Sequence, residues 1–270
     1  HVQKLKFDGM GVSLYGFELS DFSGTATLDD RGIRLPNVHI PRISGKVDGA
    51  PLEIDLTVSD YLAAPKIDVD VVLEGLDLEK ALAAKAAFLG GGAPAAGGGE
   101  PAAAPAVKSL TVDAKRSLKI KRLFHPNAEA RDLEARWDLS DITLDLKKIS
   151  GEAKFRIAGG RFDDLPKVVR REAALKAMAL PFMLLSKILK LGKIEFTEAA
   201  GLYRFKDGVM TIEDSRVTTS KGDYFVSGSI NLGDETVDVR MRSERLFPPV
   251  AAVVTGTFEN PKTKAGIAVP

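Results

Sequence analysis

The sequence contains no cysteine and only three histidines among its 270 residues. Without cysteine the chain has no disulfide, no thiolate nucleophile and no cysteine-based metal site. The histidines, His1, His39 and His125, lie far apart, and none has a neighbour at the spacing of metal ligands. We therefore expect no metal centre and no cofactor, with the histidines at the surface or at sheet edges.

The chain also lacks an excess of charge and any long apolar run. Its formal net charge of +1 gives no concentrated basic face, so we expect no nucleic-acid partner. The longest apolar run, Ala177 to Leu185, is shorter than the ~20 residues that a membrane-spanning helix needs. We therefore expect no internal membrane anchor.

Motifs for catalysis are missing as well. The carboxylate pairs Asp29-Asp30 and Asp163-Asp164 lie in turn-like sequence, where aspartate is common because it hydrogen-bonds the backbone. No serine has the context of a nucleophile elbow, and the glycine-rich segment is not followed by the Lys-Ser/Thr of a phosphate loop. We expect the protein not to be an enzyme.

What the sequence does contain is strand alternation. The stretch Gly201 to Met241 consists of short runs in which apolar and polar residues alternate, separated by Lys206-Asp207-Gly208, Lys221-Gly222-Asp223 and Gly233-Asp234-Glu235. Such triplets supply the positive-φ positions of tight turns. The pattern predicts a meander of antiparallel strands with one apolar and one polar face.

The same alternation is present near the N-terminus and in the middle of the chain. Residues 1–75 are β-rich, and strands are predicted again over Ala130 to Leu139 and Ile142 to Leu146. The segment Ser23 to Leu35 parallels Ala200 to Ile212 as strand, turn and strand. A repeated meander favours an extended sheet over a closed sandwich.

The chain divides into three segments. Residues 1–88 are expected to form an N-terminal meander followed by a short helix over 76–88, with Asp77 as its N-cap. Residues 89–107 are rich in Gly, Ala and Pro without periodicity, which is typical of a flexible linker. Residues 108–270 are expected to form a second β region with a helical insert over 165–192.

Several stretches of the chain resemble the AsmA-like family of Gram-negative envelopes. They are GEAKFRIAGGRF, EAAGLYRFKDGVMTIEDSRVTT, SGSINL, TVDVRM and VTGTFENPK in the C-terminal region, and LEGLDLEKAL earlier. The family is related to bridge-like lipid-transfer proteins of the TamB and chorein type. The resemblance implies an extended, curled antiparallel sheet that forms an apolar, taco-like trough, with short helices at one end. It also implies a periplasmic location and an inner-membrane anchor N-terminal to this chain.

By that resemblance we expect a non-enzymatic module that carries phospholipid acyl chains between inner and outer membranes, with membrane proteins as further partners. The predicted groove consists of apolar positions that share one face of their strands. They are Leu52, Ile54, Leu56, Val58, Ile67, Val69, Val71, Leu73, Tyr224, Val226, Ile230, Val237, Val239 and Met241. The alternation is equally that of a filled sandwich core, which would suit a scaffold for outer-membrane protein assembly or secretion.

The predicted insert carries a basic side with Lys187, Lys190 and Lys193, opposite a row of leucines. This helix is expected to close one end of the sheet with its lysines in water. The alternative is that the lysines rest on anionic head groups while the leucines meet acyl chains.

Overall fold

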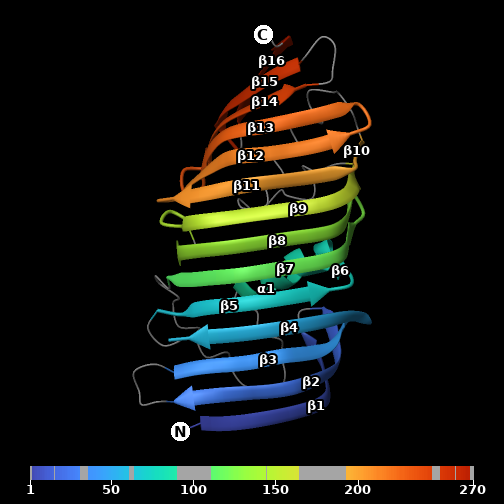
Figure 1. The fold of residues 1–270 in the computed structure, drawn as a ribbon, viewed down its shortest axis with the longest axis vertical. Coiled ribbons are helices and arrows are strands. Elements are labelled where there is room, and N and C mark those ends of the chain that lie inside the picture. The colour runs from blue at the N-terminus through green and yellow to red at the C-terminus, as the bar shows by residue number, and fades with distance from the viewer. Residues whose placement is uncertain are drawn as a thin grey trace.

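The computed structural model describes residues 2–14, 16–30, 36–60, 64–89, 111–143, 145–163, 193–244, 250–258 and 260–267. Within them, all strands belong to one sheet with the order β1-β2-β3-β4-β5-β7-β8-β9-β11-β12-β13-β14-β15-β16, with β6 beside β7 and β10 beside β9. Figure 1 shows the strands stacked as a ladder, with the N-terminus at one end and the C-terminus at the other. The predicted mainly β fold with one extended, curled antiparallel sheet is confirmed.

The first part of the ladder precedes the predicted linker. It comprises β1 (Val2–Leu14), β2 (Phe17–Asp30), β3 (Pro36–Val47), β4 (Ala50–Ser59), β5 (Lys66–Leu73), β6 (Leu76–Asp77) and helix α1 (Leu78–Leu89).

The second part continues the same sheet. It comprises β7 (Val112–His125), β8 (Ala128–Ile142), β9 (Ser150–Phe162), β10 (Ile194–Phe196), β11 (Glu198–Lys206), β12 (Val209–Thr219), β13 (Gly222–Asn231), β14 (Thr236–Ser243), β15 (Val250–Thr257) and β16 (Pro261–Ile267).

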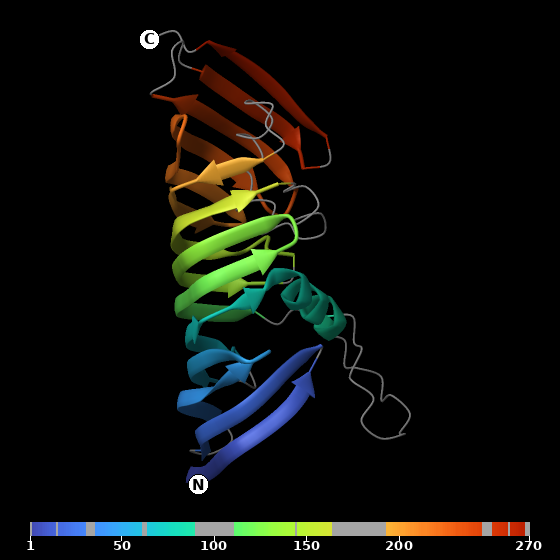
Figure 2. The same ribbon diagram turned by 90° about the vertical axis from the view of Figure 1, so that its right-hand side faces the viewer.

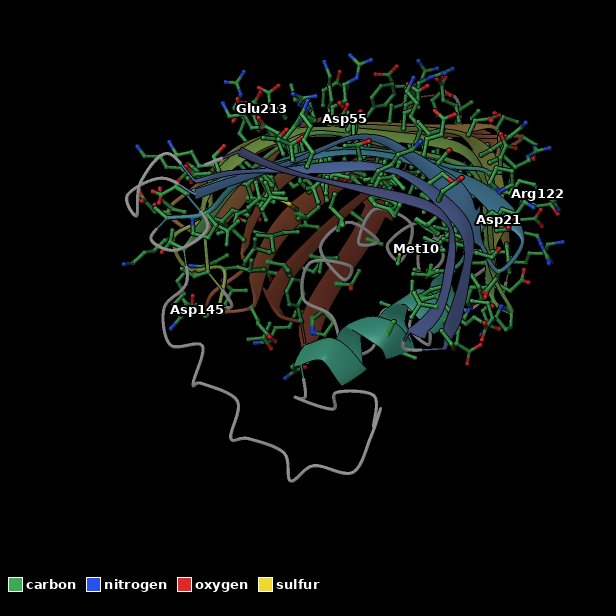
Figure 3. All side chains as sticks on the ribbon, turned by 90° about the horizontal axis from the view of Figure 1, so that it is seen from below. Met10, Asp21, Asp55, Arg122, Asp145 and Glu213 are labelled. Carbon is green, nitrogen blue, oxygen red and sulfur yellow. The ribbon has the colours of Figure 1, made fainter. Side chains whose placement is uncertain are left out.

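The sheet curls across its strands into an arch, which Figure 3 shows end-on. Asp21, Asp55, Arg122 and Glu213 point outward from the convex side, whereas Met10 lies inside the arch. Because side chains alternate along a strand, the neighbours of these residues lie on the opposite side. The strands therefore present a polar convex face and an apolar concave face, as the alternation predicts.

Five adjoining strand segments share a kink at one level, which we call the crease. On each segment, two successive residues are on the convex side. The concave positions before and after them are therefore three residues apart, as Ile120 and Leu123 are. Cross-strand pairing keeps these kinks in register from β5 and β6 to β10 and β11. The pairs of the crease are Glu74–Gly75, Lys121–Arg122, Arg131–Asp132, Ala158–Gly159 and Thr197–Glu198.

The crease accounts for part of the curl. Two successive outward residues require the backbone to leave the extended conformation, and Asp132 has a φ of 48°. Extra residues and positive-φ positions of this kind bend strands and raise their twist. Arg122 lies at the shoulder of the arch in Figure 3, where the strands turn downward.

The sheet is antiparallel except where β5 and β6 run parallel to β7. A parallel pair needs a crossover connection, and α1 begins that connection. The predicted N-cap is confirmed, because Asp77 Oδ1 accepts hydrogen bonds from the backbone N of Glu79 (2.9 Å) and of Lys80 (3.2 Å). Lys80 Nζ also contacts Asp48 Oδ2 at 2.8 Å, which ties α1 to the β3–β4 turn.

Helix α1 lies beside the middle strands and not at an end of the ladder (Figure 2). The pairing of β5 with β7 carries the sheet across the predicted segment boundary at 89–107. The predicted helical insert over 165–192 and most of the predicted linker lie outside the described residues.

The predicted strand over Ile142 to Leu146 is wrong. β8 ends at Ile142, and Asp145 Oδ1 accepts hydrogen bonds from Thr143 Oγ1 (2.6 Å) and from the backbone N of Lys147 (3.2 Å). An aspartate that bonds its neighbours in this way stabilises a turn. The local hydrogen bonding overrides the alternating pattern.

The parallel junction offers a first prediction, at Asp70. Its carboxylate accepts hydrogen bonds from Ser117 Oγ (2.5 Å) and Arg116 Nη1 (3.1 Å), and the Ser117 bond is the main reason that the pKa of Asp70 is lowered. Because the site is partly exposed, we expect Asp70→Asn to lower the free energy of unfolding by at most about 1 kcal/mol. Urea denaturation at pH 7 measures this difference.

The effect should depend on pH with a definite sign. A carboxylate with a lowered folded-state pKa stabilises the fold above the ordinary aspartate pKa of about 3.9, and this contribution is lost as pH falls through the folded-state value. The difference between wild type and Asp70→Asn should therefore shrink in acid. Asp68→Asn is the matched control, because the Asp68 side chain makes no hydrogen bond or ion pair with a described residue. Equal effects of the two substitutions would contradict the prediction.

Candidate functional site

The apolar concave face has two unlike halves. In the C-terminal half, from β9 to β15, the side chains pack into one buried cluster that includes Tyr203, Met210, Ile230, Val239 and Val254, each no more than 2% exposed. Phe155 packs against Tyr203 with ring centroids 5.5 Å apart. This half of the concave face is an ordinary protein core.

The N-terminal half, over β1 to β5, is much more open. Its buried cluster contains only Leu52, Leu73 and Ile120 among the described residues. At the edge of the sheet the large apolar side chains of Leu5, Met10 and Val12 are 64%, 56% and 54% exposed. Apolar surface of this extent needs an explanation, because a lone exposed side chain is common but a contiguous stretch is not.

Cross-strand pairing makes this open surface continuous. Leu5, Phe7 and Val12 pair with positions of β2 that share a face with the smaller cluster, and Met10 pairs with Phe22, which packs against that cluster. The concave positions of β2 to β4 that continue this surface are apolar. On β2 to β4 they include Leu19, Phe22, Gly24, Ala26, Ile40, Ile43, Gly45, Val47, Leu52, Ile54, Leu56 and Val58.

The predicted groove residues fall into both halves. Eight of them form four rungs between β4 and β5, and six lie in the C-terminal cluster. The rungs are Leu52–Leu73, Ile54–Val71, Leu56–Val69 and Val58–Ile67. In the rungs only Leu52 and Leu73 are buried, and the other six are half-buried.

The six C-terminal members of the predicted groove are between 0% and 5% exposed. They are Tyr224, Val226, Ile230, Val237, Val239 and Met241. The structure thus places all fourteen residues on the concave face but leaves surface for a ligand only at the first group.

Sequence reasoning did not include Leu5, Met10 and Val12 in the groove. The signal was interrupted by Asp8-Gly9, where the register of β1 on β2 shifts and Gly9 has a φ of 61°. The shift moves Met10 onto the concave face although it is an odd number of residues after Phe7. Only the pairing with β2 shows that the alternation resumes after the kink.

The basic residues of the predicted insert contribute little to the described site. Lys187 and Lys190 lie outside the described residues, and Lys193 contacts Glu195 at 2.8 Å. That contact is solvent-exposed, so its contribution to stability is small.

The residues considered for catalysis are not brought together. His39 Nδ1 lies 2.8 Å from Thr57 Oγ1, and His125 Nδ1 accepts a hydrogen bond from the backbone N of Asn127 at 3.0 Å. Asp30 ends β2, whereas Asp163 follows β9 and pairs with Arg161. Among the described residues no group of His, Asp and Glu side chains is arranged to hold a metal ion.

Two tyrosines are titratable groups of the C-terminal cluster. Burial raises the pKa of Tyr203, and burial also raises the pKa of Tyr224. Both stay neutral at ordinary pH, which suits a structural role in a core better than proton transfer.

Comparison of the chain with protein-family models, with curated proteins and with solved structures found no match in any of the three. In the part of the chain that the structure describes, no helix is both long and apolar enough to cross a membrane.

Proposed function

We propose that the protein binds phospholipid by holding acyl chains along the concave apolar face of β1 to β5, and that it carries them without catalysing a reaction. The observation that supports this proposal is the contiguous, partly exposed apolar surface that ends in Leu5, Met10 and Val12. None of the concave positions named above on β1 to β5 carries a charge. A polar or charged ligand would lose hydration there without gaining a partner.

The dimensions and the energies suit an acyl chain. Strands about 4.8 Å apart place β1 roughly 20 Å from β5, whereas one leaflet of a bilayer is about 15 Å of hydrocarbon. Each methylene that leaves water contributes about 0.8 kcal/mol. A surface of this length can therefore cover most of one chain without a pocket specific for the head group.

The proposal is narrower than the groove predicted from the sequence. It assigns binding to the rungs between β4 and β5 and to β1, while the six C-terminal residues hold the fold. The resemblance to AsmA-like proteins supports transfer between the inner and outer membranes, a periplasmic location and an N-terminal anchor outside this chain. These remain parts of the proposal.

A second candidate is a scaffold of the envelope, and the filled C-terminal half favours it. The two functions differ in what the protein carries. Extraction under native conditions followed by mass spectrometry should recover phospholipid in a stoichiometric amount if the protein is a carrier. Protein that yields no phospholipid, and takes up none from vesicles after delipidation, would favour the scaffold.

The most direct test of the surface compares two neighbouring valines of β5. Val71 is half-buried on the concave face and packs against the smaller cluster, whereas Val72 points to the convex side and is 43% exposed. We expect Val71→Asp to reduce bound phospholipid at least about tenfold, because a carboxylate on an acyl-binding surface costs more than ~1.4 kcal/mol. Val72→Asp should leave lipid content unchanged.

Circular dichroism and urea denaturation must show that both variants are folded before lipid content is compared. If the two folded variants retain equal amounts of phospholipid, the concave face of β5 is not the binding surface. Met10→Asp on β1 provides an additional variant with little risk of unfolding, because Met10 is more than half exposed. It should reduce lipid content in the same direction as Val71→Asp.

A further inference from the structure

A pair of arginines faces each other on the convex side of the crease. Arg122 on β7 and Arg131 on β8 are direct cross-strand partners. Like charges in directly opposite positions destabilise a sheet. An anion bound between the two guanidinium groups would remove this repulsion.

The side chain of neither arginine makes a hydrogen bond or ion pair with a described residue. The neighbouring cations, in contrast, form ion pairs. Lys121 contacts Glu74 at 3.0 Å, Arg161 contacts Glu129 at 3.3 Å and Asp163 at 3.2 Å, and Arg156 contacts Glu198 at 2.8 Å. The side chains of this pair therefore lack the carboxylate partners that most neighbouring cations have, and Arg136 and Lys154, further along β8 and β9, form a second such pair.

The neighbouring strand leaves room beside the pair. Arg131 is opposite Gly159 on β9, and the Arg131 guanidinium would be only 3.1 Å from a Cβ atom added there. Arg131 also lines a depression of about 370 Å³, together with Glu129, Arg161, Glu195, Thr197 and Ser220. The two carboxylates of this depression already have partners, in Arg161 and Lys193.

We propose that Arg122 and Arg131 bind a phosphate group on the convex face, with the rest of the ligand in the adjoining depression. A guanidinium presents a planar set of N–H donors that matches phosphate oxygens, and two such groups would neutralise a dianion. The hydroxyls of Thr197 and Ser220 add polar contacts for the ester side. This site is on the opposite side of the sheet from the acyl-binding surface and does not depend on it.

The phosphate can come from a soluble phosphomonoester or from a lipid head group, and two arms of one experiment separate these sources. The first arm titrates the full chain with inorganic phosphate and with glycerol 3-phosphate, using calorimetry and thermal unfolding. The second arm measures co-sedimentation with vesicles of phosphatidylglycerol, compared with vesicles of a galactolipid that lacks phosphate. Binding in the first arm alone identifies a soluble ligand, and binding in the second arm alone identifies a head group.

Arg131→Gln should weaken phosphate binding about tenfold, because it removes one charge-assisted contact. Arg122→Gln should have a similar effect. Lys206→Gln is the control: Lys206 is an exposed cation at the end of β11 opposite Val209, its side chain makes no ion pair with a described residue, and it lies outside the depression. It changes the net charge equally and should bind as the wild type does.

The wild type should also gain thermal stability when phosphate is added, and Arg131→Gln should gain less at the same phosphate concentration. Absence of binding in both arms would overturn the proposal. The same conclusion would follow if Lys206→Gln lost as much affinity as Arg131→Gln, since the effect would then be one of net charge. These outcomes leave the lipid content of the concave face untouched, so the two proposals fail separately.

Discussion

Val239→Asp is expected to unfold the C-terminal half of the sheet, with a loss of about 4 kcal/mol or more in the free energy of unfolding. Val239 is 0% exposed and belongs to the large buried cluster. It pairs with Gly228 on one side and with Val254 on the other. A carboxylate at this position has no cation within the cluster, and an unpaired buried charge is among the most destabilising of single changes.

The matched control is Val253→Asp on the adjoining strand. Val253 is cross-strand partner to Arg240, lies on the convex face and is 36% exposed. The same substitution there should change the free energy of unfolding by less than about 1 kcal/mol. Urea denaturation followed by tryptophan fluorescence and circular dichroism measures both variants. A cooperative, wild-type transition for Val239→Asp would contradict the prediction.

The result also bears on how far an acyl chain can extend along the protein. If Val239→Asp folds normally but loses bound phospholipid, the C-terminal concave face opens to ligands, and the binding surface runs the length of the ladder. Loss of folding confines ligands to the N-terminal strands. The difference in burial between Val239 and Met10 leads us to expect the second outcome.

The strands and their faces could be predicted from the sequence because period-two alternation is a local signal. The sequence pattern of β4, β5, β13 and β14 places their apolar residues on one face, and the pairing in the structure agrees. The N-cap at Asp77 is equally local, since it needs only the side chain and the next two backbone N–H groups.

The features that decide which face can bind a ligand are not local. The crease depends on kinks that are aligned across adjoining strands, and no single strand shows that Lys121–Arg122 lies level with Arg131–Asp132. The parallel pairing of β5 with β7 depends on where the chain returns after α1. Burial of Tyr224 and exposure of Met10 depend on what packs against each part of the sheet, so identical alternation gives a closed core in one half and an open surface in the other.

The pairing of Arg122 with Arg131 likewise could not be predicted from the sequence. Arg122 and Arg131 are separated by a turn, and a shift of the β7–β8 register by one residue would place each on a different partner. Formal net charge near zero conceals them, because most of the neighbouring charges cancel in pairs. Only the pairing shows which charges remain without a partner.

Gly228→Ala adds a single methyl group, and we expect it to lower the free energy of unfolding by about 3 kcal/mol or more. Gly228 has a φ of 130°, a conformation that residues with a Cβ atom rarely adopt. An added Cβ would lie 2.2 Å from the carbonyl O of Asp238 and 2.8 Å from the Cα of Val239. Both atoms belong to the backbone of β14, so the clash cannot be relieved by rotating a side chain.

Gly266→Ala in β16 is the control. Gly266 also lies in a strand but has open space around the position of a Cβ atom. Alanine there should be neutral or stabilise the protein by about 0.5 kcal/mol, because it restricts the unfolded chain. Thermal and urea unfolding of the two variants, with wild type, give the comparison. Equal stabilities would show that β13 and β14 can separate at little cost.

Comparison of Gly228→Ala with Gly266→Ala tests why the concave face of the C-terminal half is closed. Gly228 lies opposite Val239, between the concave positions Val226 and Ile230, at the centre of the buried cluster. If β14 must approach β13 this closely, a Cβ at residue 228 pushes the strands apart and exposes cluster side chains to water. Enhanced binding of a hydrophobic dye by Gly228→Ala, but not by Gly266→Ala, would then show that the tight approach of two strands keeps this end of the concave face filled by the protein itself.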